Sequence, residues 1–251
     1  RHSMITKAKI KHIRSLQKSK ERYTHNQYII EGWRLVQEIL KSNHELLEIY
    51  FTSEFKERHP NIVADTIKNC PLALEISQAE MQSISATETP SGILGICKIS
   101  TENQSDDKLD DNWLYLDNIS DPGNMGTLLR TAVWFGIHNI AFSRDCVDIF
   151  NPKVVRGGMG AHFHISYILD ANITQFNSTH TLYGGDQDGK SLDDFDIETP
   201  WILVLGNEAH GISQGIRKTI HRYIAIPRLG VGESLNVAVA GGIIMEKLVK
   251  K

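Results

Sequence analysis

The chain has 251 residues, of which 41% are hydrophobic and 23% charged, and these ordinary proportions exclude a collagen-like or wholly disordered chain. Its three cysteines include no C-x-x-C pair, which excludes a disulfide scaffold and a cysteine-rich zinc site and favours a reducing compartment. The net charge is −3, and no apolar run reaches the roughly 18 residues that a membrane span needs. We therefore expect a cytoplasmic globular protein with no membrane partner.

Basic residues gather at the N-terminus, although the whole chain is slightly acidic. Residues 1–41 contain ten Lys or Arg against three Glu, whereas residues 42–105 contain four against nine acidic residues. A basic arm on an acidic protein is typical of a surface that binds phosphates. A solvated helix face is the alternative, and charge alone does not decide between them.

The first part of the chain predicts alternating helices and strands. Ile10, Ile13 and Leu16 recur at helical spacing among bases, so residues 7–22 are expected to form one short amphipathic helix. A strand and turn at 28–32, a helix at 33–41 and strands at 46–52 and 93–99 are expected to follow. This alternation favours a small α/β domain over residues 4–100.

A polar, acidic stretch at residues 101–112 is predicted to be a linker, followed by a second α/β domain over residues 113–251. Its strands are expected at 113–117, 138–143, 163–168, 180–184, 201–205 and 222–226. Its helices are expected at 124–136, 151–159, 212–220 and 235–250. Regular alternation implies a mostly parallel sheet, whose ligands bind at the carboxyl ends of the strands.

Three patterns suggest chemistry that their context does not support. Residues 184–191 fit the phosphate-loop pattern G-x-x-x-x-G-K-S, but an acidic stretch stopped by Pro200 follows instead of a helix, so we expect a β-turn. Residues 230–235 begin like a dinucleotide fingerprint and lack its last glycine. His162 and His164 would point the same way on a strand, but no nearby cysteine or carboxylate completes a metal site. We favour plain strand histidines and no metal.

Three other segments place unusual side chains beside strand ends. Asp121-Pro-Gly-Asn124 forms a tight turn, in which Asn124 is suited to cap the helix that carries Arg130. Glu208 follows a buried-type strand. Ser234 or Asn236 is suited to cap the last helix. That helix contains a Gly-Gly pair at 241–242, which predicts close packing against another backbone.

These segments together resemble the three signature motifs of the SpoU/TrmH-type RNA ribose 2′-O-methyltransferases, in the knotted SPOUT superfamily. The matching residues, in the family's order and spacing, are Asp121–Arg130, Leu205–Gly211, Ile226–Pro227 and Ser234–Val237. The resemblance implies a C-terminal trefoil-knot α/β domain that works as a homodimer. Less specific matches near the N-terminus resemble the family's small α/β RNA-binding domain: Lys9–Arg14, Tyr28–Gly32 and Thr89–Ile93.

The resemblance also implies S-adenosylmethionine as the cofactor and assigns residues to it. The cofactor-binding positions correspond to Leu205, Gly206, Ile226, Pro227 and Leu235. Asn124, Glu208, Ser234 and Asn236 match residues that hold the ribose, the arginine and the cofactor tail. Arg130 matches the arginine that family proposals make the base. Because arginine is essentially always protonated, a charge-positioning role is the alternative.

The expected substrate is RNA. The RNA-binding residues expected at the N-terminus are Lys9, Lys11, Arg14 and Arg34. The added N-terminal domain favours ribosomal RNA over tRNA. A tRNA 2′-O-methyltransferase and an RNA-binding module without catalysis remain alternatives, and a nucleotide hydrolase built on residues 184–191 is a weaker one.

Overall fold

The computed structural model describes residues 4–100, 111–194 and 196–251, and these residues form two compact units. The first unit combines residues 4–100 with Asp148–Phe163, and the second combines residues 111–147 with residues 164–251. Most of the predicted linker lies outside the described residues. None of the described helices is long and apolar enough to cross a membrane.

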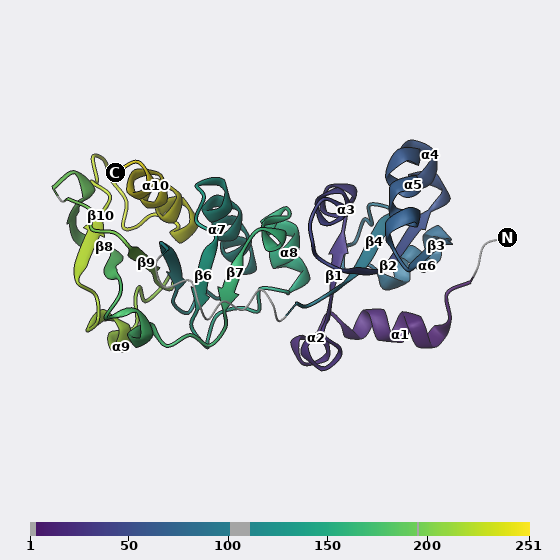
Figure 1. Cartoon of the computed structure of the whole chain (residues 1–251), viewed down its shortest axis with the longest axis horizontal. Helices are drawn as coiled ribbons and strands as arrows, with labels where there is room; N and C mark the ends of the chain where they lie inside the picture. Colours follow the sequence, from purple (N-terminus) through teal and green to yellow (C-terminus); the bar gives the residue numbers. More distant parts are fainter. Residues whose placement is uncertain (1–3, 101–110, 195) are drawn as a thin grey trace. The chain divides into compact units, whose positions relative to one another are not determined.

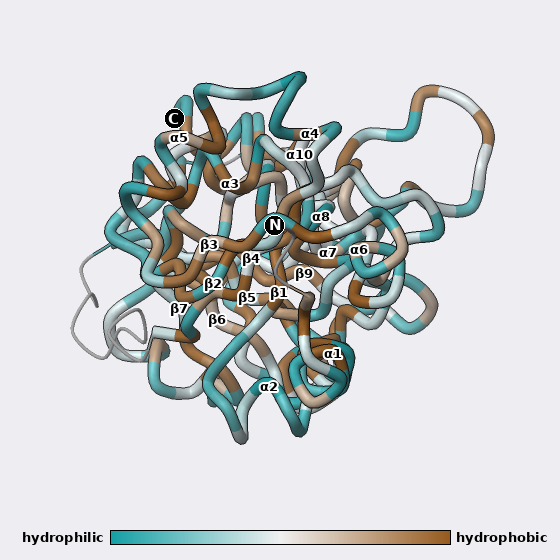
Figure 2. Tube along the Cα trace, turned by 90° about the vertical axis from the view of Figure 1, so that its right-hand side faces the viewer, coloured by the Kyte–Doolittle hydropathy of each residue, from teal (hydrophilic) through white to brown (hydrophobic). Residues whose placement is uncertain are grey.

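The first unit is built on a four-stranded sheet in the order β1-β4-β2-β3. β4 is antiparallel to β1 and β2, whereas β2 and β3 are parallel. The strands are β1 (Gln27–Glu31), β2 (Leu46–Thr52), β3 (Leu72–Ile76) and β4 (Ile93–Lys98). Apolar side chains such as Ile29, Leu94 and Ile96 form the core on which the amphipathic helices pack, and Figure 2 shows hydrophobic segments running through the strands.

The predicted single helix at 7–22 is wrong, because the chain forms two helices there. The helices of this unit are α1 (Lys7–Ser15), α2 (Ser19–His25), α3 (Trp33–Leu40), α4 (Ser53–Arg58), α5 (Pro60–Asn69) and α6 (Gln78–Ile84). Leu16 is fully buried, and its carbonyl accepts a 2.8 Å hydrogen bond from the buried Arg22 guanidinium. The carbonyl that ends α1 is thus satisfied by a side chain from α2.

Residues 148–163 lie between two strands of the second unit in sequence but group with the first unit. They contain α8 (Pro152–Gly158) and the 3₁₀ turn η2 (Ala161–Phe163). Asp148 accepts hydrogen bonds from Arg22 Nε at 2.9 Å and from the Tyr23 hydroxyl at 2.9 Å. The Phe150 ring lies 4.7 Å from that of Tyr28. An ion pair and aromatic packing therefore tie this segment to the first unit, while the proposed boundaries at 100 and 113 remain a prediction.

His162 and His164 do not share a strand as predicted. β7 begins only at Ser166, and His162 lies in η2, where Nε2 bonds to the Ile149 carbonyl at 2.6 Å. Within the described residues no cluster of three metal-ligating side chains is found. Burial lowers the pKa of His162 to about 4, so its ring is neutral at pH 7.

The second unit is built on a six-stranded sheet in the order β10-β8-β9-β5-β6-β7, and every pairing is parallel, as predicted. Its strands are β5 (Trp113–Leu116), β6 (Asn139–Phe142), β7 (Ser166–Ile168), β8 (Thr181–Ser191), β9 (Trp201–Leu205) and β10 (Arg222–Ala225). Every residue of β5, β6 and β9 is buried, as expected for parallel strands covered on both faces.

The β-turn predicted at residues 184–191 is wrong. These residues continue β8 and pair with β10 through Gly184 and Lys190. A Cβ at Gly189 would lie 2.6 Å from the Tyr223 carbonyl carbon, so glycine permits close pairing of the two backbones. Only the three-residue 3₁₀ turn η4 (Leu192–Asp194) follows. A phosphate loop needs a helix N-terminus at that point.

Two long helices, α7 (Pro122–Trp134) and α10 (Val237–Val249), lie side by side in the second unit (Figure 1). A Cβ on Gly241 would lie 2.7 Å from Leu128 Cδ2 and 2.8 Å from Leu205 Cδ1. The glycine thus meets side chains of α7 and β9 rather than another backbone, which corrects the predicted contact. The helix that follows β9 in the chain, α9 (Gln214–Arg217), is shorter than the predicted 212–220.

Candidate active site

The first turn of α7 presents Asn124 at the carboxyl edge of the parallel sheet. Asp121, and not Asn124 as predicted, caps this helix: its carboxylate accepts from the Asn124 backbone N–H at 2.7 Å. Pro122 occupies the first helical position, where its missing N–H costs nothing. Because Asp121 does the capping, the side chain of Asn124 is available for another partner.

A hydrogen-bonded row joins the three segments that the sequence singled out. Asn236 caps α10 by accepting from the backbone N–H groups of Ala238 and Val239. Its Nδ2 therefore faces away and donates to Asn124 Oδ1 at 2.9 Å. Asn124 Nδ2 in turn donates to Glu208 Oε1 at 2.7 Å.

The orientation of both amides in this row follows from the cap, since each amide has one acceptor and one donor end. Glu208 Oε2 makes no hydrogen bond within the described part of the chain. Glu208 is exposed and Asn124 half-buried. A preorganised carboxylate with a free oxygen can accept a hydrogen bond from a hydroxyl or a cation of a ligand.

Glu208 stands on a tight loop that begins at Gly206. A Cβ on Gly206 would lie 2.2 Å from the Gly211 carbonyl carbon and 2.2 Å from Ile212 N. Asn207 and Gly211 exchange backbone hydrogen bonds at 3.0 and 2.8 Å. Only glycine at 206 lets the chain cross itself here, and the crossing fixes the direction in which Glu208 projects.

Two residues that the sequence analysis gave no role, Asp117 and Asn207, fix this loop. Asp117 is buried at the end of β5 and accepts from the Ser213 N–H at 2.6 Å. Asn207 Nδ2 donates to the Asn118 carbonyl at 2.9 Å, and its Oδ1 accepts from the Ala209 N–H at 2.8 Å. The position of Asp117 directly after an apolar strand is the signal from which such a role could have been predicted.

The residues expected to bind the cofactor surround the same edge. Leu205 and Gly206 are buried, Ile226 is half-buried, and Pro227 and Leu235 are exposed. The backbone of residues 226–235 makes no hydrogen bond to the backbone of other described residues. The Gly232 carbonyl accepts from Arg228 Nη1 at 2.8 Å. The other backbone N–H and C=O groups of this segment, beside apolar side chains, fit a ligand with a flat heteroaromatic ring, which needs hydrogen bonds at its edge and apolar contact on its faces.

Arg130 and Ser234 are not part of the row. Arg130 is exposed and makes no hydrogen bond or ion pair within the described ranges. It lies six residues beyond Asn124 on α7, which places the two side chains about 120° apart around the helix axis. Ser234 is exposed on the loop before α10. Both side chains are free to meet a substrate.

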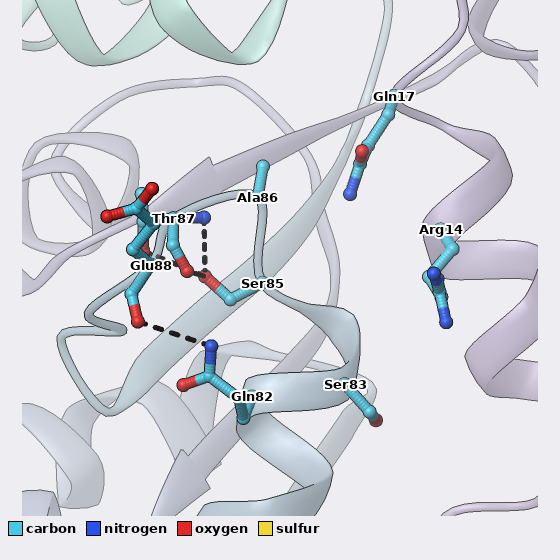
Figure 3. A pocket seen from close by; sticks show the side chains of 8 residues that line it. All are labelled: Arg14, Gln17, Gln82, Ser83, Ser85, Ala86, Thr87 and Glu88. Atoms are coloured by element: carbon cyan, nitrogen blue, oxygen red, sulfur yellow. Dashed lines mark hydrogen bonds between the residues drawn. The ribbon is translucent and has the colours of Figure 1, made fainter.

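The expected RNA-binding bases of the first unit differ in their surroundings. Lys9 is engaged in an ion pair with Glu48 at 2.7 Å. Lys11 and Arg14 have no acidic partner among the described residues, and the Arg34 guanidinium lies over the Trp33 ring. Arg14 and Gln17 face residues 82–88 across a polar groove of about 380 Å³ (Figure 3). Of these four expected bases, Lys11, Arg14 and Arg34 are thus available for phosphates.

Hydrogen bonds to the interior of the unit fix residues 85–88, which line the groove opposite Arg14. Buried Glu31 accepts from the Ser85 hydroxyl at 2.6 Å and from the Ala86 N–H at 2.8 Å. The Gln82 amide donates to the Glu88 carbonyl at 3.2 Å (Figure 3). A carboxylate in the unit's interior thereby orders the surface loop 85–88.

A parallel α/β unit with its polar row at the carboxyl edge, joined to a small α/β unit, defines a protein of the SPOUT class of methyltransferases, whose members share this fold. Residues 111–246 match the SpoU rRNA Methylase family, and residues 7–95 match the MRM3-like substrate binding domain. The chain belongs to the SpoU rRNA methylase family, which confirms the resemblance that its motifs suggested.

Relatives and solved structures agree with this assignment. The chain is 31% identical to the 23S rRNA (guanosine(2553)-2′-O)-methyltransferase RlmP of Bacillus subtilis, over 96% of this chain and 95% of the relative. A TrmH-family structure from Porphyromonas gingivalis is 29% identical with a TM-score of 0.84 over 98% of each chain. An AdoMet-bound rRNA methyltransferase from Sinorhizobium meliloti is 25% identical with a TM-score of 0.83, over 99% of this chain and 96% of that one.

Proposed function

We propose that the protein transfers a methyl group from S-adenosylmethionine to a ribose 2′-hydroxyl of ribosomal RNA. The observation that carries this proposal is the row Asn236–Asn124–Glu208, which links all three motif segments at one edge of the sheet. The relative named above is a 23S rRNA 2′-O-methyltransferase, and a structural neighbour was solved with AdoMet bound. Both support the same reaction class.

The cofactor would be held by Leu205, Gly206, Ile226, Pro227 and Leu235. When bound, S-adenosylmethionine would supply an electrophilic methyl carbon on a sulfonium sulfur: the bond from the ribose oxygen to this carbon forms as the sulfur–carbon bond breaks, which leaves S-adenosylhomocysteine. The proton of the hydroxyl would pass by way of the exposed Glu208 carboxylate to water. The chain's part is to hold the hydroxyl oxygen in line with this carbon, which is where most of the acceleration of such a transfer arises. The apolar side chains and free backbone groups at 226–235 suit this holding role.

The hydrogen-bonded row and the side chains of Arg130 and Ser234 would position the substrate and the cofactor. Glu208 and Asn124 present a carboxylate oxygen and an amide N–H toward the ribose, while Asn236 fixes their orientation. Ser234, exposed on the loop before α10, belongs with these residues to the set that would hold the ribose, Arg130 and the cofactor tail. Arg130 places a permanent positive charge beside an RNA phosphate and so positions the hydroxyl. We favour positioning over proton abstraction, because a guanidinium does not give up its proton in proteins.

The homodimer belongs to the same proposal. Val239 and Ile243, one turn apart on α10, are 53% and 36% exposed, and Trp134 at the end of α7 is 83% exposed. Side chains of this kind on adjacent helices form an apolar face that a second copy of the chain would cover. The free cysteines suit the cytoplasm, where we propose that the protein acts. Light scattering on the purified protein measures the oligomeric state directly.

The proposed reaction is tested in two steps. Titration with S-adenosylhomocysteine by calorimetry should show saturable binding near one per chain, and ATP in parallel should show none. Transfer from labelled S-adenosylmethionine should then be measured on ribosomal RNA and on tRNA separately. Label in ribosomal RNA at a ribose 2′-oxygen is the expected result. Label in tRNA alone would replace the substrate, and binding of RNA without transfer to either would leave an RNA-binding module.

A further inference from the structure

The first unit exposes an aromatic stack at the start of α3, built from residues that do not line the polar groove. The Trp33 indole is 37% exposed and lies nearly parallel to the His59 imidazole, with ring centroids 5.9 Å apart and planes 19° apart. Parallel rings in contact lie about 3.5 Å apart, so a 5.9 Å separation means that the imidazole is displaced sideways. His59 therefore covers only part of the indole face.

Arg34 completes the stack and contributes a cation without a carboxylate partner among the described residues. Its guanidinium carbon lies 5.3 Å from the Trp33 ring centroid. Neighbouring cations are bound to carboxylates, as in the pairs Lys41–Glu38 at 3.7 Å and Lys56–Glu75 at 2.9 Å. Arg34 has no carboxylate partner within the described part of the chain. A planar cation on an exposed indole matches both a base face and a phosphate.

The stack is held by fixed backbone on both sides. Gly32 has φ +104°, which favours glycine, and its N–H donates to the Ile93 carbonyl at 3.2 Å immediately before Trp33 opens α3. His59 sits at the junction of α4 and α5, and its ring contacts that of buried Phe55 at 4.7 Å. A preformed aromatic surface loses little conformational entropy when a ligand stacks on it.

We propose that Trp33, His59 and Arg34 form a stacking platform for an unpaired base of the RNA substrate, with Arg34 also contacting the adjacent phosphate. This inference rests on the proposed function, because it takes RNA as the partner. Unpaired bases are recognised by stacking on aromatic rings and guanidinium planes, whereas bases inside a duplex are not accessible to such a surface. The platform therefore selects a loop, bulge or end of the RNA.

The test compares three variants of the full-length protein for binding of a single-stranded oligoadenylate RNA and of an RNA duplex of equal length. Trp33→Ala should raise the Kd for the single strand about tenfold, leave the duplex Kd unchanged, and be largely rescued in Trp33→Phe. Lys41→Gln removes one charge from the end of the same helix and is the matched control, expected to change either Kd by about twofold or less. Fluorescence quenching by the single strand should be smaller in Trp33→Phe than in the wild type.

Two results would overturn the platform. Equal losses in Trp33→Ala and Lys41→Gln would show that charge alone holds the RNA, and an unchanged single-strand Kd in folded Trp33→Ala would show that no base stacks there. Circular dichroism checks folding, and Trp33→Phe repeats the test with an aromatic ring retained. If the wild type methylates RNA while the Kd of Trp33→Ala is unchanged, the stacking platform is rejected and the proposed function stands. If the wild type methylates no RNA but Trp33→Ala still loses affinity for the single strand, the proposed reaction is rejected and the platform stands.

Discussion

The two units of the protein place their most informative polar groups differently. In the second unit the central strands are wholly buried, and Asn124, Glu208 and Asn236 gather at the carboxyl edge of the sheet. In the first unit the charged Arg22 lies in the interior, 1% exposed, with its guanidinium bonded to Asp148. The polar row of the second unit is accessible to a ligand, whereas the buried ion pair of the first unit stabilises the fold.

This difference has a consequence for how each unit is completed. The second unit joins distant strands such as β5 and β9 through backbone pairing in its sheet, whereas the first unit holds the distant segment Asp148–Phe163 through side-chain contacts of Asp148 and Phe150. A buried charge needs its partner, so the first unit depends on a segment more than a hundred residues away from Arg22. The first unit is thus the more sensitive to a single broken ion pair.

Replacing Asp148 by Ala gives the largest expected effect on stability and sharpens the comparison. It leaves Arg22 buried without its carboxylate, which costs about 3–5 kcal/mol, and the loss should appear in the first unit. Hydrogen exchange of peptides from β1 and β4 measures it, with β5 and β9 as the internal reference. Asp145→Ala, at an exposed acid three residues earlier, is the control. Equal acceleration of exchange in both units would show that the two do not differ in this way.

Replacing Arg130 by Ala tests the edge site without disturbing the fold. Because Arg130 contacts no other described side chain through a hydrogen bond or ion pair, the free energy of unfolding and S-adenosylhomocysteine binding should stay near wild type. Methyl transfer should fall by about a hundredfold or more. Arg144→Ala removes another exposed arginine of the same unit and should retain transfer. Loss of S-adenosylhomocysteine binding in Arg130→Ala would instead place this residue at the cofactor.

The first unit should also lose stability in mild acid. Burial lowers the pKa of His162 to about 4, so between roughly pH 6.5 and pH 4 the unfolded chain binds a proton that the native chain does not. The contribution of His162 to the free energy of unfolding is therefore complete above pH 6.5 and decreases as the pH falls through this window, by about 2 kcal/mol at pH 5. Urea unfolding of the wild type and His162→Gln at pH 7.5 and pH 5 measures the difference. An equal pH dependence in the two proteins would assign the loss to other groups.

Replacing either of two neighbouring glycines in α10 by Ala should change the free energy of unfolding of the second unit only slightly. Gly241→Ala places a Cβ 2.7 Å from Leu128 Cδ2, so overpacking should cost about 1–3 kcal/mol. At Gly242 the nearest atom, Thr131 Cγ2, is 3.5 Å away, an ordinary contact, so Gly242→Ala should stabilise the helix by up to about 1 kcal/mol. Thermal unfolding compares the two. The same sign of change in both variants would show that α10 does not pack against α7 in the described way.

The sequence by itself determined much of the second unit. Apolar runs bounded by turn residues predicted the approximate positions of its strands, and the alternation of strands and helices predicted that the sheet is mostly parallel, whereas the order of the strands came only from the structure. It also indicated the residues of the edge row, since Asn124, Glu208 and Asn236 each follow a strand end or open a helix. The family assignment rested on those same segments.

Only the tertiary structure decided which partner each polar group takes. Capping rules allowed Asn124 to cap α7, but Asp121 took that place and left Asn124 to join two distant motifs. Periodicity predicted one helix at 7–22, but the first helix ends at Ser15, and the carbonyl of the next residue, Leu16, accepts a hydrogen bond from the buried Arg22 guanidinium. Residues 184–191, which match the phosphate-loop pattern, are part of β8 because their backbone pairs with β10. The local sequence specifies which backbone conformations are low in free energy. Long-range pairing of polar groups selects among these conformations, and no short stretch of sequence contains both partners of such a pair.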